Sequence, residues 1–183
     1  MIEKNNIKSS NSSSITLRFR NDILNKLKHE AAQKRISLNT LASQVFSSHA
    51  EYNVYASTSG MVSFHKSLLI RLMDRLQEDE IEKLSEHIAK NEMKDLTLLL
   101  RGELNLSSFL KTIESWLRVS GFQYSYYISD DDKSHRFVIQ HEMGRKWSLY
   151  FEKLFSYVFN DLSSVKKPEF DITDNIVAFR VQE

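Results

Sequence analysis

The chain has 183 residues, of which 41% are hydrophobic and 27% are charged, and its formal net charge is +1. This composition indicates a packed protein of one ordinary domain or two small ones, and excludes an intrinsically disordered or collagen-like chain. The absence of Cys excludes disulfide scaffolds, thiolate metal sites and cysteine nucleophiles. Neither a membrane-spanning apolar run nor the apolar core of a signal peptide is present, so we expect a cytoplasmic protein without a membrane partner.

Basic residues are concentrated in the first third of the chain. Up to Thr58 there are eight basic and four acidic residues, whereas the remainder holds 17 basic and 20 acidic residues. A small basic module followed by a mildly acidic body is typical of a polyanion-binding head joined to a second functional region.

The N-terminus is predicted to consist of a disordered tail and one short strand. Residues 1–13 are dominated by Lys, Asn and Ser, which favour disorder. Residues 14–20 (SITLRFR) then alternate, with Ile15, Leu17 and Phe19 on one face and Ser14, Thr16, Arg18 and Arg20 on the other. No partner strand follows within the first 50 residues, so we expect the strand to pair with its copy in a second chain, which predicts a homodimer.

Two helices are predicted next, separated by a short turn. Residues 21–35 (NDILNKLKHEAAQKR) carry apolar side chains at helical spacing, and a second apolar stripe extends from Leu38 to about Tyr52. Ser37 is a typical N-cap for the second helix, and the turn before it is Lys34-Arg35-Ile36.

In this order the three elements resemble a ribbon-helix-helix DNA-binding domain of the Arc, MetJ and CopG repressor type, over residues 14–52. The resemblance implies an intertwined dimer that inserts an antiparallel β-ribbon into the major groove of a palindromic operator, as a sequence-specific transcriptional regulator. The family often has Gly in the turn between its helices, whereas this chain has none there. We therefore expect one turn residue to adopt a left-handed backbone conformation.

The resemblance also assigns the residues that would touch DNA. Base contacts are expected from Ser14, Thr16 and Arg18, and phosphate contacts from Arg20, Ser37, Leu38 and Asn39. Arg18 suits a bidentate hydrogen bond to guanine, which is worth about 1–3 kcal/mol of discrimination. Backbone N–H groups and the helix dipole at the start of the second helix favour a phosphate.

The rest of the chain is predicted to form a linker and a second domain. Residues 53–60 are interpreted as the linker, and residues 61–183 as a helical segment followed by a ββαββ α/β effector or oligomerisation domain. Apolar residues at helical spacing continue up to Gly121. The two hairpins of the ββαββ succession then flank a helix that starts at Gly144. The predicted fold class is therefore α+β, with no evident internal repeat and no recognised family for the second domain.

His, Asp and aromatic residues of the second domain are further candidates for binding sites. Six His residues raise the question of a metal site, but four of them, His65, His87, His135 and His141, match no known ligand spacing, and no metal or cofactor is predicted. The run Asp130 to Asp132 favours a solvated hairpin turn over a cation site. An aromatic set favours core packing, although a pocket for a planar ligand between the sheet and a helix stays open as an alternative: Tyr124, Tyr126, Tyr127, Trp147, Tyr150, Phe151 and Tyr157.

The sequence predicts no enzyme, because no catalytic constellation is evident. The expected partners are double-stranded DNA, a second copy or a higher homo-oligomer, and a small-molecule or protein effector at residues 61–183. A different class of function is kept as the alternative. In it the N-terminal module serves mainly for dimerisation, and the second domain carries the activity as an antitoxin-like or sensor module that binds a protein or ligand.

Overall fold

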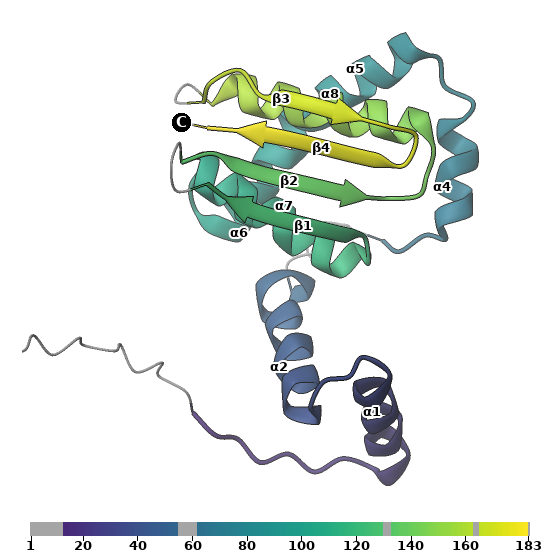
Figure 1. Cartoon of the computed structure of the whole chain (residues 1–183), viewed down its shortest axis with the longest axis vertical. Coiled ribbons are helices and arrows are strands. Elements are labelled where there is room, and N and C mark those ends of the chain that lie inside the picture. The colour runs from purple at the N-terminus through teal and green to yellow at the C-terminus, as the bar shows by residue number, and fades with distance from the viewer. Residues whose placement is uncertain (1–12, 55–61, 130–132, 163–164, 183) are drawn as a thin grey trace, which may run out of the picture. The chain divides into compact units, whose positions relative to one another are not determined.

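The computed structural model describes residues 13–54, 62–129, 133–162 and 165–182 (Figure 1). Contacts within the chain divide it into Met1–Gln44, here called the head, and Val45–Glu183, here called the body. The protein is of the mixed α+β class, as predicted. The predicted disordered tail, except its last residue, and positions 55–60 of the predicted linker lie outside the described residues, as do residues 130–132 of the acidic turn.

The head consists of an extended segment and two helices. Residues 13–20 lead as an extended segment into α1 (Asn21–Gln33), and α2 (Leu38–Ser48) follows after a short turn (Figure 1). The helix then continues through the π-helical turn η1 (His49–Asn53), so the boundary between head and body falls within α2. Ala31 and Leu41 are the buried residues of α1 and α2.

The turn between α1 and α2 contains one left-handed residue, as the resemblance to ribbon-helix-helix domains implies. Arg35 has φ of +54°. The N–H groups of Arg35 and Ile36 donate to the carbonyls of Ala32 and Ala31 at 3.1 and 3.0 Å, which satisfies acceptors at the end of α1. These hydrogen bonds offset a backbone strain of roughly 1–2 kcal/mol for a non-Gly residue.

The body is built on a four-stranded antiparallel sheet in the order β1-β2-β4-β3. Its strands are β1 (Gln123–Ile128), β2 (His135–Gln140), β3 (Glu169–Ile172) and β4 (Ile176–Val181). Helix α8 (Arg145–Asp161) connects β2 to β3, so the predicted ββαββ succession is confirmed. Phe137 and Phe179 are register partners in the two central strands, and both are buried.

The remaining helices of the body precede the sheet in sequence. They are α4 (Lys66–Met73), α5 (Glu78–Ile88), the π-helical turn η2 (Ala89–Met93), α6 (Lys94–Arg101) and α7 (Leu106–Ser120). Gly121 ends α7 with φ of +71°, as its position after the apolar stripe predicts. Within the described residues, no helix combines the length and the apolarity that crossing a membrane requires.

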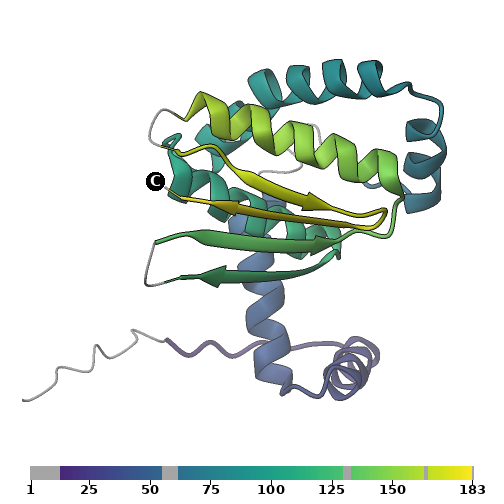
Figure 2. The same cartoon turned by 45° about the horizontal axis from the view of Figure 1, so that its top comes forward.

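Helices α5 to α8 lie on one face of the sheet (Figures 1 and 2). The core between the helices and the sheet contains five fully buried Phe side chains, those of Phe109, Phe137, Phe155, Phe159 and Phe179. On the opposite face, the side chains of Arg136 and Arg180 are exposed, because alternate residues of a strand point to opposite faces.

The succession of α1, turn, α2 and η1 recurs 40 residues later as α4, turn, α5 and η2. The second helix of each pair begins with an equivalent backbone hydrogen bond of 3.0 Å. In α2 it runs from the N–H of Leu41 to the carbonyl of Ser37, and in α5 from the N–H of Ile81 to the carbonyl of Gln77. Sequence inspection does not detect this similarity, because Arg35 and Arg75 are the one identical pair between residues 30–53 and 70–93.

Candidate nucleic-acid interface

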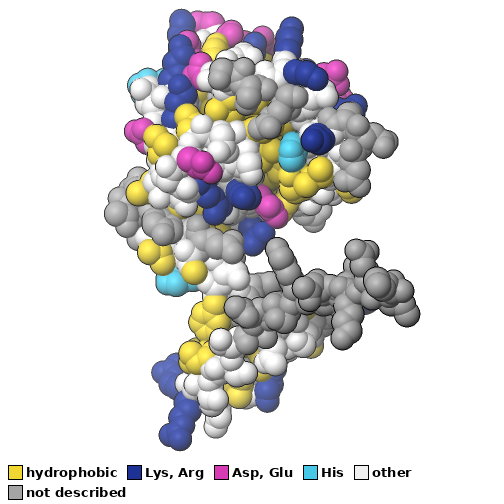
Figure 3. Space-filling view, turned by 90° about the vertical axis from the view of Figure 1, so that its left-hand side faces the viewer, with side chains coloured by type: hydrophobic (Ala, Val, Ile, Leu, Met, Phe, Trp, Pro, Cys, Tyr) yellow, Lys and Arg dark blue, Asp and Glu magenta, His cyan; other side chains and the backbone are white. Residues whose placement is uncertain are grey.

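The extended segment of the head exposes both of its faces. The apolar side chains of Ile15, Leu17 and Phe19 are 79%, 44% and 43% exposed, and those of Thr16 and Arg18 on the alternate face are exposed as well. The described part of the chain provides no strand that pairs with this segment. An amphipathic segment in this state leaves apolar surface and backbone groups in water, which is the condition that strand pairing with another chain would relieve. Exposed apolar side chains of the head helices are visible in Figure 3, next to Lys and Arg side chains.

The two arginines of the segment differ in their contacts. Arg18 makes no hydrogen bond or ion pair with any described residue, so its guanidinium can meet a ligand without breaking an internal contact. Arg20 donates from Nη2 to Asp22 Oδ2 at 2.9 Å. A phosphate at Arg20 would have to compete with this exposed ion pair, although such pairs are weak.

The N-terminus of α2 leaves backbone donors unpaired. Ser37 Oγ accepts from the N–H of Thr40 at 3.0 Å and also lies 2.8 Å from the Thr40 hydroxyl. The N–H groups of Leu38 and Asn39 meet no acceptor among the described residues, and the first turn of the helix contains no acidic residue. This arrangement is chemically suited to an anion, since the free N–H groups and the helix dipole both favour negative charge.

The equivalent helix start in the body has the opposite electrostatics. The first turn of α5 contains Glu78, Asp79 and Glu80. The carboxylate of Glu80 accepts from the N–H of Gln77 at 2.7 Å, so the protein itself supplies negative charge there. A phosphate would be repelled at α5, and of these two similar helix starts only that of α2 is suited to one.

The predicted DNA-contacting residues lie on two separate segments of one chain. Ser14, Thr16, Arg18 and Arg20 belong to the extended segment, and Ser37, Leu38 and Asn39 to the start of α2. No hydrogen bond or ion pair within the described residues joins the two groups.

The rings of His141 and His135 both lie within hydrogen-bond distance of other residues of the body. The ring of His141 is fully buried, its Nδ1 accepts from the N–H of Met143 at 3.1 Å, and its Nε2 lies 2.9 Å from Ser148 Oγ. Burial, with a smaller effect of Lys66, lowers the pKa of His141 to about 4. His135 Nδ1 lies 2.7 Å from the hydroxyl of Tyr126. Across the described ranges, no three residues among His, Asp and Glu come together as a metal site.

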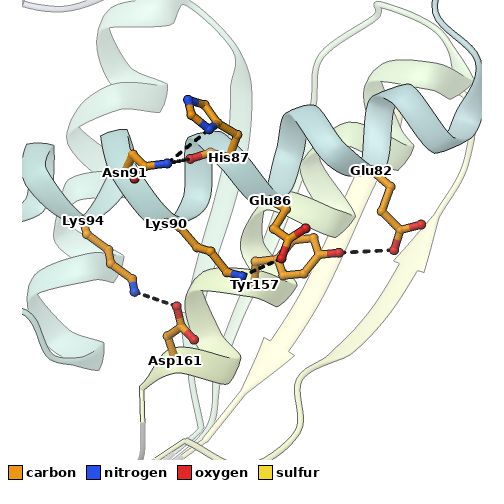
Figure 4. A network of polar contacts seen from close by, with 8 residues as sticks. All are labelled: Glu82, Glu86, His87, Lys90, Asn91, Lys94, Tyr157 and Asp161. Carbon is orange, nitrogen blue, oxygen red and sulfur yellow. Dashed lines mark hydrogen bonds and ion pairs between the residues drawn. The ribbon is translucent and has the colours of Figure 1, made fainter.

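A polar cluster on α5, η2, α6 and α8 is a second candidate for chemistry (Figure 4). Its contacts join Tyr157 to Glu82, Lys90 to Glu86, Lys94 to Asp161 and Asn91 to His87. Every side chain drawn is paired with a neighbour, and most of the ion pairs lie at the surface. The cluster therefore links α5 and α6 to α8, joins η2 to α5, and offers no uncommitted group for a substrate.

The aromatic set from the sequence is divided between core and surface. Tyr150 and Phe151 are buried, whereas Tyr127 is 61% exposed. A cavity of about 700 Å³ is present, but it lies among α5, η2, α6, α7 and α8, and not between the sheet and a helix as considered from the sequence. Sequence reasoning missed Glu92, Asp95 and Trp116 as members of its lining, because helices far apart in sequence bring them together.

Comparisons with models of known protein families, with curated proteins and with solved structures find no match to this chain. The resemblance of residues 14–52 to ribbon-helix-helix domains thus stays a prediction from the sequence pattern.

Proposed function

We propose that the protein is a dimeric, sequence-specific DNA-binding transcriptional regulator whose residues 14–52 form a ribbon-helix-helix module. One observation carries the proposal. The segment 14–20 alternates apolar and polar side chains, is exposed on both faces, and has no strand partner among the described residues.

Pairing two copies of this segment would remove from water both its unpaired backbone groups and its apolar side chains. The antiparallel ladder would satisfy the backbone groups, and Ile15, Leu17 and Phe19 would turn toward the helices of the dimer. Each large apolar side chain contributes roughly 1.5–3 kcal/mol when it becomes fully buried. The resulting two-stranded ribbon has the width that the major groove of B-DNA admits.

The outer face of such a ribbon would carry the specificity. Thr16 and Arg18 would face base edges, and the unpaired N–H groups at the start of α2 would hold a backbone phosphate. The contrast between α2 and α5 supports this assignment, because the helix start of α5 carries acidic residues and that of α2 carries none.

The test begins with selection of duplexes from a random pool by the full chain, followed by fluorescence anisotropy with the selected duplex. Arg18→Ala should weaken binding to that duplex by about 1–3 kcal/mol per protomer and should change random-sequence binding less. Arg136→Ala is the matched control, since the side chain of Arg136 is also exposed and makes no hydrogen bond or ion pair with the described residues. Affinity for the selected and for the random duplex should fall steeply as salt is raised from roughly 50 to 200 mM, because phosphate contacts release counterions from the DNA.

Oligomeric state provides the second part of the test. Leu17→Glu places a charge on the apolar face of the segment and should shift the dimer toward monomer in light-scattering measurements. A well-folded wild-type dimer without affinity for any duplex at low salt would contradict the proposal. That result would favour the alternative, a dimeric ligand- or protein-binding module, for which the cavity of the body is the specific observation.

A further inference from the structure

The cavity of the body has an aromatic wall. Among the residues that line it are Trp116 from α7 and Trp147, Tyr150 and Phe151 from α8. The ring centroids of Trp147 lie 5.3 Å from Tyr150 and 5.5 Å from Phe151, and those of Trp116 and Phe151 lie 5.7 Å apart. Phe151 is 3% exposed, so the wall is anchored in the core. A volume of about 700 Å³ is within the range that accepts a drug-sized ligand.

Two polar groups of this wall lack a partner. The indole N–H of Trp147 is buried and has no hydrogen-bond acceptor among the described residues. Tyr150 is only 8% exposed, and its hydroxyl likewise makes no hydrogen bond to the described part of the chain. An unsatisfied buried polar group costs free energy, so the indole N–H of Trp147 favours a guest that offers an acceptor atom or a π-face.

The charged side chains that line the cavity are all acidic among the described residues. Glu92 from η2 and Asp95 from α6 line it, and no Lys or Arg does so among the described lining residues. Burial, with a smaller contribution from the charge of Glu92, raises the pKa of the Tyr150 hydroxyl above its usual value, so the group stays a neutral donor. Carboxylates beside aromatic faces attract cations and repel anions.

We infer that this cavity is a binding site for an aromatic organic cation, whose rings pack on the Trp and Phe side chains while its charge lies beside Glu92 and Asp95. The aromatic wall supplies apolar contact and cation–π attraction, and the carboxylates select the sign of the charge. The inference rests on residues 88–155 alone and does not depend on DNA binding by the head.

The chain is well suited to a direct test, because both of its Trp residues line the cavity. The probes are tetraphenylphosphonium and tetraphenylborate, which have nearly the same shape and opposite charge. Titration of the full chain with tetraphenylphosphonium should quench Trp fluorescence saturably, and tetraphenylborate should bind at least about tenfold more weakly, because its charge has the same sign as the two carboxylates. Equal affinity for the two ions, or no saturable quenching by the cation, would overturn the inference.

Variants of the lining residues test whether binding occurs in this cavity, and distinguish the effect of the carboxylate charges from that of the cavity's shape. The double variant Glu92→Gln with Asp95→Asn should weaken the phosphonium ion about tenfold and reduce the difference between the two ions. The control is Asp79→Asn with Glu82→Gln, which removes two negative charges from α5 at positions outside the lining and should leave the difference unchanged. Leu96→Trp should block the cavity and abolish binding of both ions. If instead the control pair and the lining pair weaken the cation equally, the cation recognises the general charge of the body and the site assignment is wrong.

Discussion

Burial of a neutral histidine makes the stability of the body depend on pH in a defined direction. His141 is fully buried, and its pKa falls from the usual 6.5 to about 4. A base whose pKa is lowered in the folded state stays neutral there while the unfolded chain takes up a proton. The contribution of His141 to stability is therefore complete above pH 6.5 and is lost as the pH falls from 6.5 toward 4.

The magnitude follows from the size of the shift. One pKa unit corresponds to about 1.4 kcal/mol, so the whole effect is about 3 kcal/mol, of which about 2 kcal/mol is lost by pH 5. The comparison is between wild type and His141→Asn, which retains an acceptor for the N–H of Met143 and does not titrate. The variant should be less stable by roughly 1–3 kcal/mol at pH 7.5, because it loses the contact to Ser148 and leaves space.

The assay is urea unfolding of the full chain between pH 7.5 and 5, followed by Trp fluorescence, which reports on the body because both Trp residues lie there. The free energy of unfolding of wild type minus that of His141→Asn should fall by about 2 kcal/mol as the pH is lowered over this range. His87→Asn, at an exposed position on α5, is the control and should give a curve parallel to that of wild type. A constant difference between wild type and His141→Asn from pH 7.5 to 5 would refute the reasoning.

Three further predictions concern the stability of the body. Phe109→Ala removes a fully buried ring and should lower the free energy of unfolding by about 3–5 kcal/mol in urea titrations, whereas Leu99→Ala, half exposed, should cost much less. Gly121→Ala should cost about 1–2 kcal/mol through backbone strain at φ of +71°, and thermal unfolding should show this although no atom lies within 4 Å of the added Cβ. Asn105→Ala removes the acceptor for the N–H of Ser108 at 2.9 Å and should lower the free energy of unfolding by about 1 kcal/mol, and Asn105→Asp should restore most of it.

Local features of the fold could be predicted from short stretches of sequence. The end of α7 at Gly121 and the start of α2 after Ser37 each depend on a few neighbouring residues, whereas a left-handed turn residue was expected from the family resemblance, which did not single out Arg35. The two hairpins and the helix between them were predictable because the change of apolar period from 3.6 to 2 is itself a local signal.

The candidate sites show where such reasoning stops. The alternation in residues 14–20 distinguished an apolar from a polar face, but the strand that it predicts is an extended segment without a ladder partner among the described residues. In contrast, Glu92, Asp95 and Trp116 have no shared signal in the sequence, because they line one cavity only after α6 and α7 are positioned beside α8. The recurrence of the helix pair after 40 residues was also hidden, since the two segments share almost no identical residues.

The order of helices and strands, the apolar face of each and the basic character of the head were determined by the amino-acid sequence itself. These properties arise from side-chain periodicity, capping and charge, which act between residues close together in the chain. Tertiary structure alone decided that helices α5 to α8 pack on one face of the sheet, that His141 is buried without charge, and that two carboxylates meet an aromatic wall. Such outcomes depend on contacts between residues distant in sequence, where packing selects one arrangement among many that the same local patterns allow.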